Sequence, residues 1–249
     1  MSFTDYVFMC TVTIIPKGDK DFVLTSNRDE APSRIALAPD FYTIEHTRLL
    51  YPKDECSGGT WIGLSDKNRL VCLLNGGFEL HQRKETYRLS RGVVVKDFLI
   101  SHTITTVMQS YNLEDIEPFT MVIVDWNSEL KFYELIWDGS EKYISKLPLE
   151  PKLWSSSTLY SQPMKIERKA WFESYKKDHE LNAKSLMQFH KTAGKNNDEY
   201  GVIMNRGFVK TMSITQVEKT GEDIKMTYEN LSTNIVTTKQ FKTPQIINE

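Results

Sequence analysis

Alternation of β-rich segments with short turns constrains the fold of this chain most strongly. Such segments cover residues 6–15, 22–26, 61–64, 69–74, 119–126, 129–137, 143–146, 152–154, 208–216, 224–228 and 235–241. Several are separated only by turn residues, as at Pro16-Lys17-Gly18-Asp19. A four-residue turn between two β-rich segments is typical of a hairpin. The sequence therefore predicts antiparallel sheets.

Helical periodicity is confined to the middle of the chain. Residues 90–111 place apolar side chains on one face, with Ser90 as the expected N-cap. A second helix is predicted for residues 161–178, where Pro163 suits the first turn, and a third for residues 183–192. There is no internal repeat, so we predict one α+β domain over residues 1–249, with helices packed on antiparallel sheets.

Composition excludes several functional classes. The 249 residues are 40% hydrophobic and 26% charged, as in globular proteins. Lys and Arg number 31 against 33 Asp and Glu, which argues against a nucleic-acid partner. No segment approaches the ~20 apolar residues of a membrane span, and the first residues lack the basic charge of a secretion signal. Three cysteines predict neither a disulfide framework nor a zinc site, and hence a cytoplasmic, reducing location.

The first candidate cluster combines Cys10 with the run Asn27-Arg28-Asp29-Glu30. In the predicted hairpin, position 10 pairs near position 26, so Cys10 lies beside residues 27–29. A neighbouring cation favours the nucleophilic thiolate, so Arg28 is expected to lower the pKa of Cys10, while Asp29 holds an amine or fixes the guanidinium. The alternative is that Cys10 is a small buried hydrophobe and that the charged run is a solvated turn.

Two glycine-containing segments follow. The adjacent Gly58 and Gly59, before Thr60 and Trp61, predict a positive φ or a close backbone approach, with N–H groups facing a ligand carbonyl. The alternative is a plain loop that leads Trp61 into the core. Asn75, before Gly76, offers a side-chain N–H to an oxyanion, or else forms a common Asn-Gly turn.

Basic residues gather before the first predicted helix: His81, Arg83, Lys84, Arg88 and Arg91. They form either an anion site at the helix N-terminus or ordinary solvated surface. The five histidines show no metal-ligand spacing, so we predict no metal. His81 is the histidine nearest Asn75 in the sequence.

The order of these motifs resembles the NRDE family, which is the transport-and-Golgi-organisation family. The resemblance rests on Met9-Cys10-Thr11, Asn27-Arg28-Asp29-Glu30, Gly58-Gly59-Thr60-Trp61-x-Gly63 and Leu74-Asn75, and more loosely on residues 154–160 and 211–213. It implies an N-terminal-nucleophile (Ntn) hydrolase fold, a four-layer αββα sandwich of two antiparallel sheets between helical layers. The strands and helices predicted independently agree with this fold.

The family is distantly similar to choloylglycine hydrolases and penicillin V acylases, amidases with an N-terminal cysteine nucleophile. The similarity implies that Cys10 is the nucleophile, that its free α-amine is the base, and that no cofactor is needed. It further implies that Arg28 stabilises thiolate and substrate, that Asp29 orients the amine and that Asn75 forms the oxyanion hole. We assign substrate binding to Asn27, Gly59, Thr60, His81 and Ser156. The last stands where the acylases have an asparagine before a helix.

Residues 1–9 precede Cys10, whereas this mechanism needs a free amine on Cys10. They are a propeptide, an extension from a misassigned start codon, or a permanent segment that leaves the cysteine without its base. Two functions follow: a cysteine-dependent hydrolase of linear amides, or a non-catalytic ligand-binding or trafficking protein that uses the same pocket. Secretory organisation and haem handling among eukaryotic relatives favour binding of haem or another small hydrophobic ligand, although there is no haem-attachment motif. Either function implies a small-molecule partner, and the sequence gives no oligomeric state.

Overall fold

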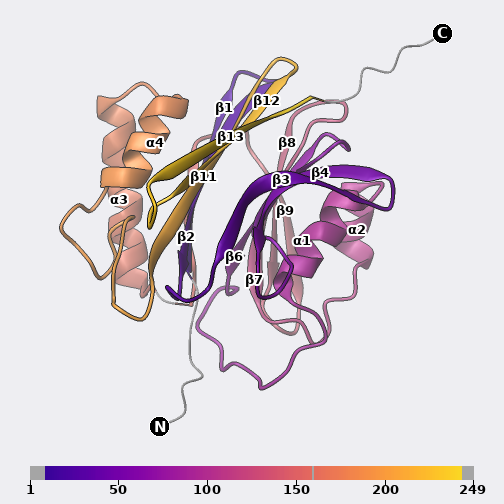
Figure 1. Cartoon of the computed structure of the whole chain (residues 1–249), viewed down its shortest axis with the longest axis horizontal. Coiled ribbons are helices and arrows are strands. Elements are labelled where there is room, and N and C mark those ends of the chain that lie inside the picture. The colour runs from indigo at the N-terminus through magenta and orange to yellow at the C-terminus, as the bar shows by residue number, and fades with distance from the viewer. Residues whose placement is uncertain (1–8, 159, 243–249) are drawn as a thin grey trace.

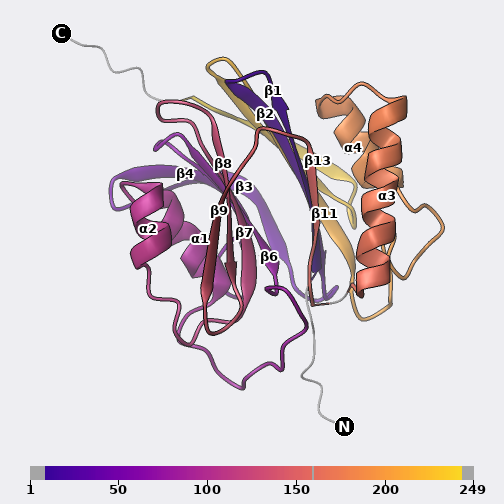
Figure 2. The same cartoon turned by 180° about the vertical axis from the view of Figure 1, so that it is seen from behind.

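Two antiparallel sheets lie face to face between two layers of helices (Figures 1 and 2). The structure is a computed structural model and describes residues 9–158 and 160–242. Helices α3 and α4 cover the outer face of one sheet, and α1 and α2 cover the outer face of the other. The predicted four-layer α+β sandwich is confirmed.

The six-stranded sheet A has the order β10-β1-β2-β11-β12-β13. Its strands are β1 (Met9–Lys17), β2 (Asp21–Glu30), β10 (Lys152–Ser155), β11 (Lys210–Thr220), β12 (Asp223–Asn230) and β13 (Ile235–Phe241). The seven-stranded sheet B runs in sequence order from β3 to β9. Its strands are β3 (Ala36–Ile44), β4 (Thr47–Asp54), β5 (Ile62–Ser65), β6 (Arg69–Asn75), β7 (Phe119–Asp125), β8 (Lys131–Trp137) and β9 (Lys142–Leu147).

Strands β3 and β4 were not predicted, and each contains a proline, which weakens a strand signal. In β3 the pairing shifts between Leu37 and Asp40, on either side of Pro39, so the irregularity absorbs the missing N–H. Strand β2 is longer than predicted, because Asn27 to Glu30 continue the ladder. All four of these polar residues are buried, so the alternative of a solvated turn is wrong.

The helices are α1 (Arg91–Ile100), α2 (Ile104–Ser110), α3 (Gln162–Asp178) and α4 (Ala183–Thr192). The last two agree with prediction, but residues 90–111 form two helices rather than one. Arg69 Nη1 donates to the carbonyls of Phe98 at 2.7 Å and Ser101 at 2.9 Å, which satisfies carbonyls at the end of α1 and stops the helix there. Within the described ranges, none of these helices has the length and apolar content needed to cross a bilayer.

The three largest apolar clusters among the described residues hold the sandwich together. One lies between the sheets, and Cys10 belongs to it together with Val12. Another joins sheet B to α1 through Phe98, and a third joins sheet A to α3 and α4 through Phe172 and Phe189. Because strand side chains alternate, inner strands such as β1 and β7 contribute to the layers on both of their faces.

Candidate functional site

The register of the β1–β2 hairpin places Cys10 next to the polar run of β2. Cys10 pairs with Arg28, and Met9 pairs with Asp29. The turn lies over residues 18–20, later than predicted, which moves the partner of Cys10 from residue 26 to Arg28. The expected proximity of Cys10 to residues 27–29 therefore occurs, with a corrected register.

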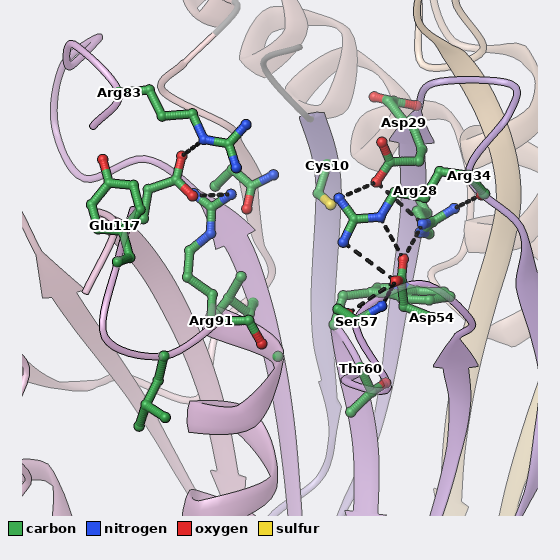
Figure 3. A pocket seen from close by; sticks show the side chains of 18 of the residues that line it. Cys10, Arg28, Asp29, Arg34, Asp54, Ser57, Thr60, Arg83, Arg91 and Glu117 are labelled. Atoms are coloured by element: carbon green, nitrogen blue, oxygen red, sulfur yellow. Dashed lines mark hydrogen bonds and ion pairs between the residues drawn. The ribbon is translucent and has the colours of Figure 1, made fainter. Parts of the chain in front are cut away.

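Cys10 lines a cavity of about 290 Å³ between the two sheets and the start of α1. Arg28, Asp29, Asn75 and Thr60 line the same cavity. Figure 3 shows Cys10, Arg28, Arg34, Asp54 and Ser57 on one side, and Arg83, Arg91 and Glu117 on the other. The cavity thus has two charged walls, and the thiol lies on one of them.

The Cys10 thiol is deeply buried, with 5% of the residue exposed. Burial raises the pKa of this thiol well above its usual value, and the negative charge of Asp29 raises it further. Arg28 opposes these effects without overcoming them. Arg28 thus lowers the pKa of Cys10 as predicted, but the net shift is upward, because desolvation outweighs one neighbouring cation.

The Arg28 guanidinium is already paired. Its Nη2 donates to Asp54 Oδ2 at 2.8 Å and to Glu30 Oε2 at 3.1 Å, and its carbon lies 4.7 Å from the ring centre of Trp61. Arg34 Nε also donates to Asp54 Oδ2, at 2.8 Å. Burial raises the pKa of Glu30 to about 7, although both arginines favour its charged form. The two arginines and two acids form a rigid, largely neutralised wall beside the thiol.

Asp29 is a buried carboxylate held by two hydroxyl groups. Thr211 Oγ1 donates to its Oδ1 at 2.6 Å, and the Tyr160 hydroxyl donates to its Oδ2 at 3.4 Å. Burial raises the pKa of Asp29 to about 6, while the hydroxyl of Thr211 and the charge of Arg168 favour the ionised form. Asp29 therefore carries a negative charge above about pH 6 despite its burial.

Ser156 joins the two sheets beside Cys10. Its backbone N–H donates to the carbonyl of Cys10 at 3.1 Å, and its Oγ donates to the carbonyl of Asn75 at 2.6 Å. Ser156 is not among the residues that line the cavity, whereas Asn75 is. The serine thus fixes the backbones that carry Cys10 and Asn75.

The glycine pair shows both predicted features. Gly58 has a φ of +65°, and a Cβ placed on Gly59 would lie 2.9 Å from the Cα of Gly92 in α1. Thr60 Oγ1 donates to the carbonyl of Ile62 at 2.8 Å, and Trp61 is buried in the inter-sheet core. Gly59 does not line the cavity, but its close approach to Gly92 sets the start of α1 against it.

Two further predicted residues lie elsewhere. Asn27 faces the α4 layer, where its Nδ2 donates to the carbonyls of His190 at 3.1 Å and Val202 at 2.6 Å. His81 contacts a residue of the opposite wall, with Nε2 3.5 Å from Glu117 Oε1. Neither residue is among those lining the cavity. Burial lowers the pKa of His81.

The basic cluster divides between the cavity and the surface. Arg83 and Arg91 line the cavity and pair with Glu117 at 3.6 Å and 3.2 Å. Lys84 instead pairs with Asp115, and Arg88 donates to backbone carbonyls, both on exposed surface. Sequence reasoning missed Glu117, since no local motif connects it with the residues that it meets.

Other functional contacts had a partial signal. Thr211 and Tyr160 lie in the two looser family motifs, to which no role was assigned, and Asp54 lies four residues before Gly58. Arg168 had no signal of its own, because the pattern of its helix was read only from the apolar residues. Among the described residues, no three His, Cys, Asp or Glu side chains gather as they would around a metal ion.

Comparison with known sequences matches most of this chain to one family. The profile of the family described as Transport and Golgi organisation 2 matches residues 9–240. A comparison with curated protein sequences finds no significant match.

Solved structures with the same architecture are Ntn hydrolases. A variant of the conjugated bile acid hydrolase from Clostridium perfringens has 9% identity and a TM-score of 0.56, covering 95% of this chain and 98% of that one. Penicillin V acylase from Agrobacterium tumefaciens has 9% identity and a TM-score of 0.55, covering 93% and 86%. The Caenorhabditis elegans orthologue of N-acylethanolamine-hydrolyzing acid amidase has 10% identity and a TM-score of 0.57, covering 83% and 91%. At such identities the likeness shows the fold alone.

Proposed function

Since this chain belongs to the Transport and Golgi organisation 2 family and has an Ntn-hydrolase fold, we propose that it is a cysteine-dependent hydrolase of linear amide bonds. Cys10 is the nucleophile after the residues that precede it have been removed. The observation that carries this proposal is the shared cavity, where Cys10 lies with Arg28, Asp29 and Asn75. These four side chains come from three strands, β1, β2 and β6.

The ladder supports removal of the preceding residues as the activating step. Met9 pairs with Asp29 and Cys10 with Arg28, so the peptide bond between residues 9 and 10 lies opposite the backbone of residues 28 and 29. Its hydrolysis leaves an α-amine on Cys10 with a normal pKa near ~8. Asp29 is then placed to orient that amine. Until this step, the nitrogen of Cys10 is part of a peptide bond and cannot act as a base.

The reaction then follows from the groups in the cavity. The α-amine accepts the proton of the Cys10 thiol, and the thiolate attacks the amide carbonyl carbon. The side-chain N–H of Asn75 stabilises the oxyanion, and Arg28 stabilises negative charge beside the sulfur. Collapse of the tetrahedral intermediate breaks the C–N bond, and the ammonium returns its proton to the leaving amine. Water hydrolyses the resulting thioester and regenerates the thiol.

The test compares the whole chain with a chain that starts at Cys10, as verified by intact mass. We expect only the shorter chain to hydrolyse N-acyl aminocoumarin amides of different acyl lengths and to gain the mass of one acyl group. The matched control is the shorter chain with Cys10→Ala. A folded chain that starts at Cys10 but forms no acyl adduct would overturn the proposal, as would equal rates with Cys10→Ala.

Thiol reactivity gives a second measure of the same step. In the whole chain we expect iodoacetamide to modify the exposed Cys56 well before the buried Cys10, whose pKa is raised. In the chain that starts at Cys10, the order should reverse, because the amine promotes thiolate formation. Peptide mapping by mass spectrometry reports both rates, and the buried Cys72 serves as an internal reference.

A second function is favoured by the burial of the unprocessed thiol. If residues 1–9 stay in place, the same cavity binds a small molecule without cleaving it. Its volume of about 290 Å³ is near the lower end for ligand pockets, and charged side chains form much of its lining. This small volume and charged lining do not suit a large apolar macrocycle such as haem. We expect haem titration of the whole chain to leave the Soret band unshifted.

A further inference from the structure

Behind the cavity, helix α3 places a fully buried arginine against the strands that carry the site. Arg168 has 0% exposure. Its Nε donates to Ser155 Oγ at 3.0 Å, and its Nη2 donates to Thr11 Oγ1. Its Nη1 donates to the carbonyls of Tyr200 at 2.5 Å and Gly201 at 3.1 Å. One guanidinium thus connects α3, β1, β10 and the loop before β11.

The two hydroxyl partners of Arg168 flank the proposed nucleophile. Thr11 follows Cys10 directly and pairs with Ser155 across the β1–β10 ladder. Ser155 precedes Ser156, whose N–H donates to the Cys10 carbonyl. Because strand side chains alternate, Thr11 faces α3 while Cys10 faces the cavity. Arg168 therefore holds the two strands together at the level of Cys10, from the opposite face of sheet A.

Among the described residues, the charge of Arg168 has no direct partner of opposite sign. In the described part of the chain, none of its hydrogen bonds or ion pairs is to a carboxylate. The Tyr160 ring centre lies 4.1 Å from its guanidinium carbon, and the hydroxyl of Tyr160 donates to Asp29. A buried cation needs a compensating charge, and the carboxylate across this ring is Asp29.

The other groups around this pair fit the same assignment. Arg168 and Arg206 favour the ionised form of Asp29, as do the hydroxyls of Thr211 and Tyr160. On the α4 side, burial and the charge of Arg168 lower the pKa of His190 to about 3, so this histidine is neutral. His190 therefore adds no positive charge, and Asp29 is left as the acid that balances Arg168.

We propose that Arg168 is a positioning residue of the Cys10 site: it clamps Thr11 and Ser155 beside the nucleophile and supplies the charge that balances the Asp29 carboxylate. The positioning role in catalysis rests on the proposed hydrolase function. The coupling between Arg168 and Asp29 does not, and it can be tested in the whole chain without any substrate.

The first experiment is a double-mutant cycle of Arg168→Met and Asp29→Asn in the whole chain. Urea unfolding at pH 8 should show coupling of at least tenfold in the unfolding constant, because both groups are charged. At pH 5 the coupling should largely disappear, because Asp29, with a pKa of about 6, is protonated. Equal effects of Arg168→Met in both backgrounds at both pH values would overturn the proposal.

Arg168→Lys provides a second variant if Arg168→Met does not fold. It keeps the charge but cannot make the same set of hydrogen bonds. The coupling to Asp29 at pH 8 should therefore persist, while the variant still loses stability through Thr11 and Ser155. Loss of coupling in Arg168→Lys would contradict the assigned balance of charge.

The second experiment measures the pH profile of amide hydrolysis by the chain that starts at Cys10. Arg168→Met should move the acid limb of kcat/KM upward by about one pH unit, since Asp29 then ionises less readily, and Arg168→Lys should restore it. Arg69→Met, which removes an equally buried arginine from the other helical layer, should leave the limb in place. An unmoved limb in Arg168→Met would refute the catalytic role. An inactive parent chain would refute the hydrolase proposal, while the unfolding cycle would still decide the coupling.

Discussion

Among the described residues, Arg69 is fully buried against the α1–α2 layer and Arg168 within the α3–α4 layer, but their charges are balanced differently. Arg69 lies 3.4 Å from Asp125, its partner in the β6–β7 ladder, and also donates to carbonyls at the end of α1. Arg168 has comparable hydrogen bonds, but among residues 9–158 and 160–242 none of them is to an acid. The comparison shows that on the side of the α1–α2 layer the charge of Arg69 is balanced by an adjacent acid, Asp125. On the side of the α3–α4 layer, the charge of Arg168 is balanced by Asp29, which lines the cavity.

The starts of the helices differ in a complementary way. Ser161 accepts a hydrogen bond from the N–H of Met164 at the start of α3, and Asn182 forms a capping box with Ser185 at the start of α4. The side chain of Ser90 makes no capping bond, and the first turn of α1 lines the cavity instead. Each layer therefore contributes to the site: one through a helix end, and the other through a buried side chain.

The largest expected effect concerns His190 in the α3–α4 layer. Its pKa is lowered to about 3 in the folded chain, so it stays neutral there but takes up a proton on unfolding below pH 6.5. The free energy of unfolding should therefore fall between pH 6.5 and pH 3, by up to about 5 kcal/mol from this group. Urea unfolding of the parent and of His190→Gln at several pH values isolates this contribution.

Two acids oppose the effect of His190. Asp29 and Glu30 have raised pKa values of about 6 and about 7, so they bind protons more readily in the folded chain and stabilise it as the pH falls through their window. They are present in both the parent and His190→Gln and therefore cancel in the difference. Parallel pH curves for the two proteins would contradict the assignment of a neutral, buried His190.

The second largest expected effect is the loss of stability when the charge of Arg69 is removed. Arg69→Met should destabilise the chain by about 4 kcal/mol, because Asp125 and the end of α1 lose their donor. Urea unfolding measures this loss. In Arg69→Met combined with Asp125→Asn, the total should be smaller than the sum of the single effects. Additive losses would show that the two charges do not balance each other.

The smallest expected effect is a difference in stability between substitutions at the N-caps of α4 and α1. Asn182→Ala should cost about 1 kcal/mol, because it removes the side-chain oxygen that accepts the N–H of Ser185 in the capping box of α4. Ser90→Ala should change stability by less than about 0.5 kcal/mol, because its side chain makes no such bond. Thermal unfolding of both variants tests the contrast, and equal losses would contradict it.

Most of the fold could be predicted, because hairpins and helices leave local patterns in the sequence. β3 and β4 were missed since Pro39 and Pro52 interrupt their strand signal. The break at Ser101 depends on Arg69, a residue far away in the chain that the pattern of residues 90–111 does not contain. Local periodicity therefore identified the elements but not the contacts that end them.

The site was predicted less completely, for a related reason. The neighbours of Cys10 follow from a hairpin, which is local, and the structure brings Arg28, Asp29 and Asn75 to the same cavity. The pKa of the Cys10 thiol depends mainly on its burial between the sheets. The residues next to Cys10 in the sequence do not predict this burial. From the sequence alone, Arg168 is expected to be a surface cation in a polar helix. Its burial results from the packing of α3 against sheet A.

The contact between Gly59 and Gly92 has a consequence for the shape of the cavity. Each glycine lies where a methyl group would meet backbone atoms of the other segment at 3.0 Å or less. Because neither residue has a side chain, the loop after β4 can lie directly against the first turn of α1. Alanine at either position would push these backbones apart and change the shape of the cavity that Cys10 lines. No charged group would be altered.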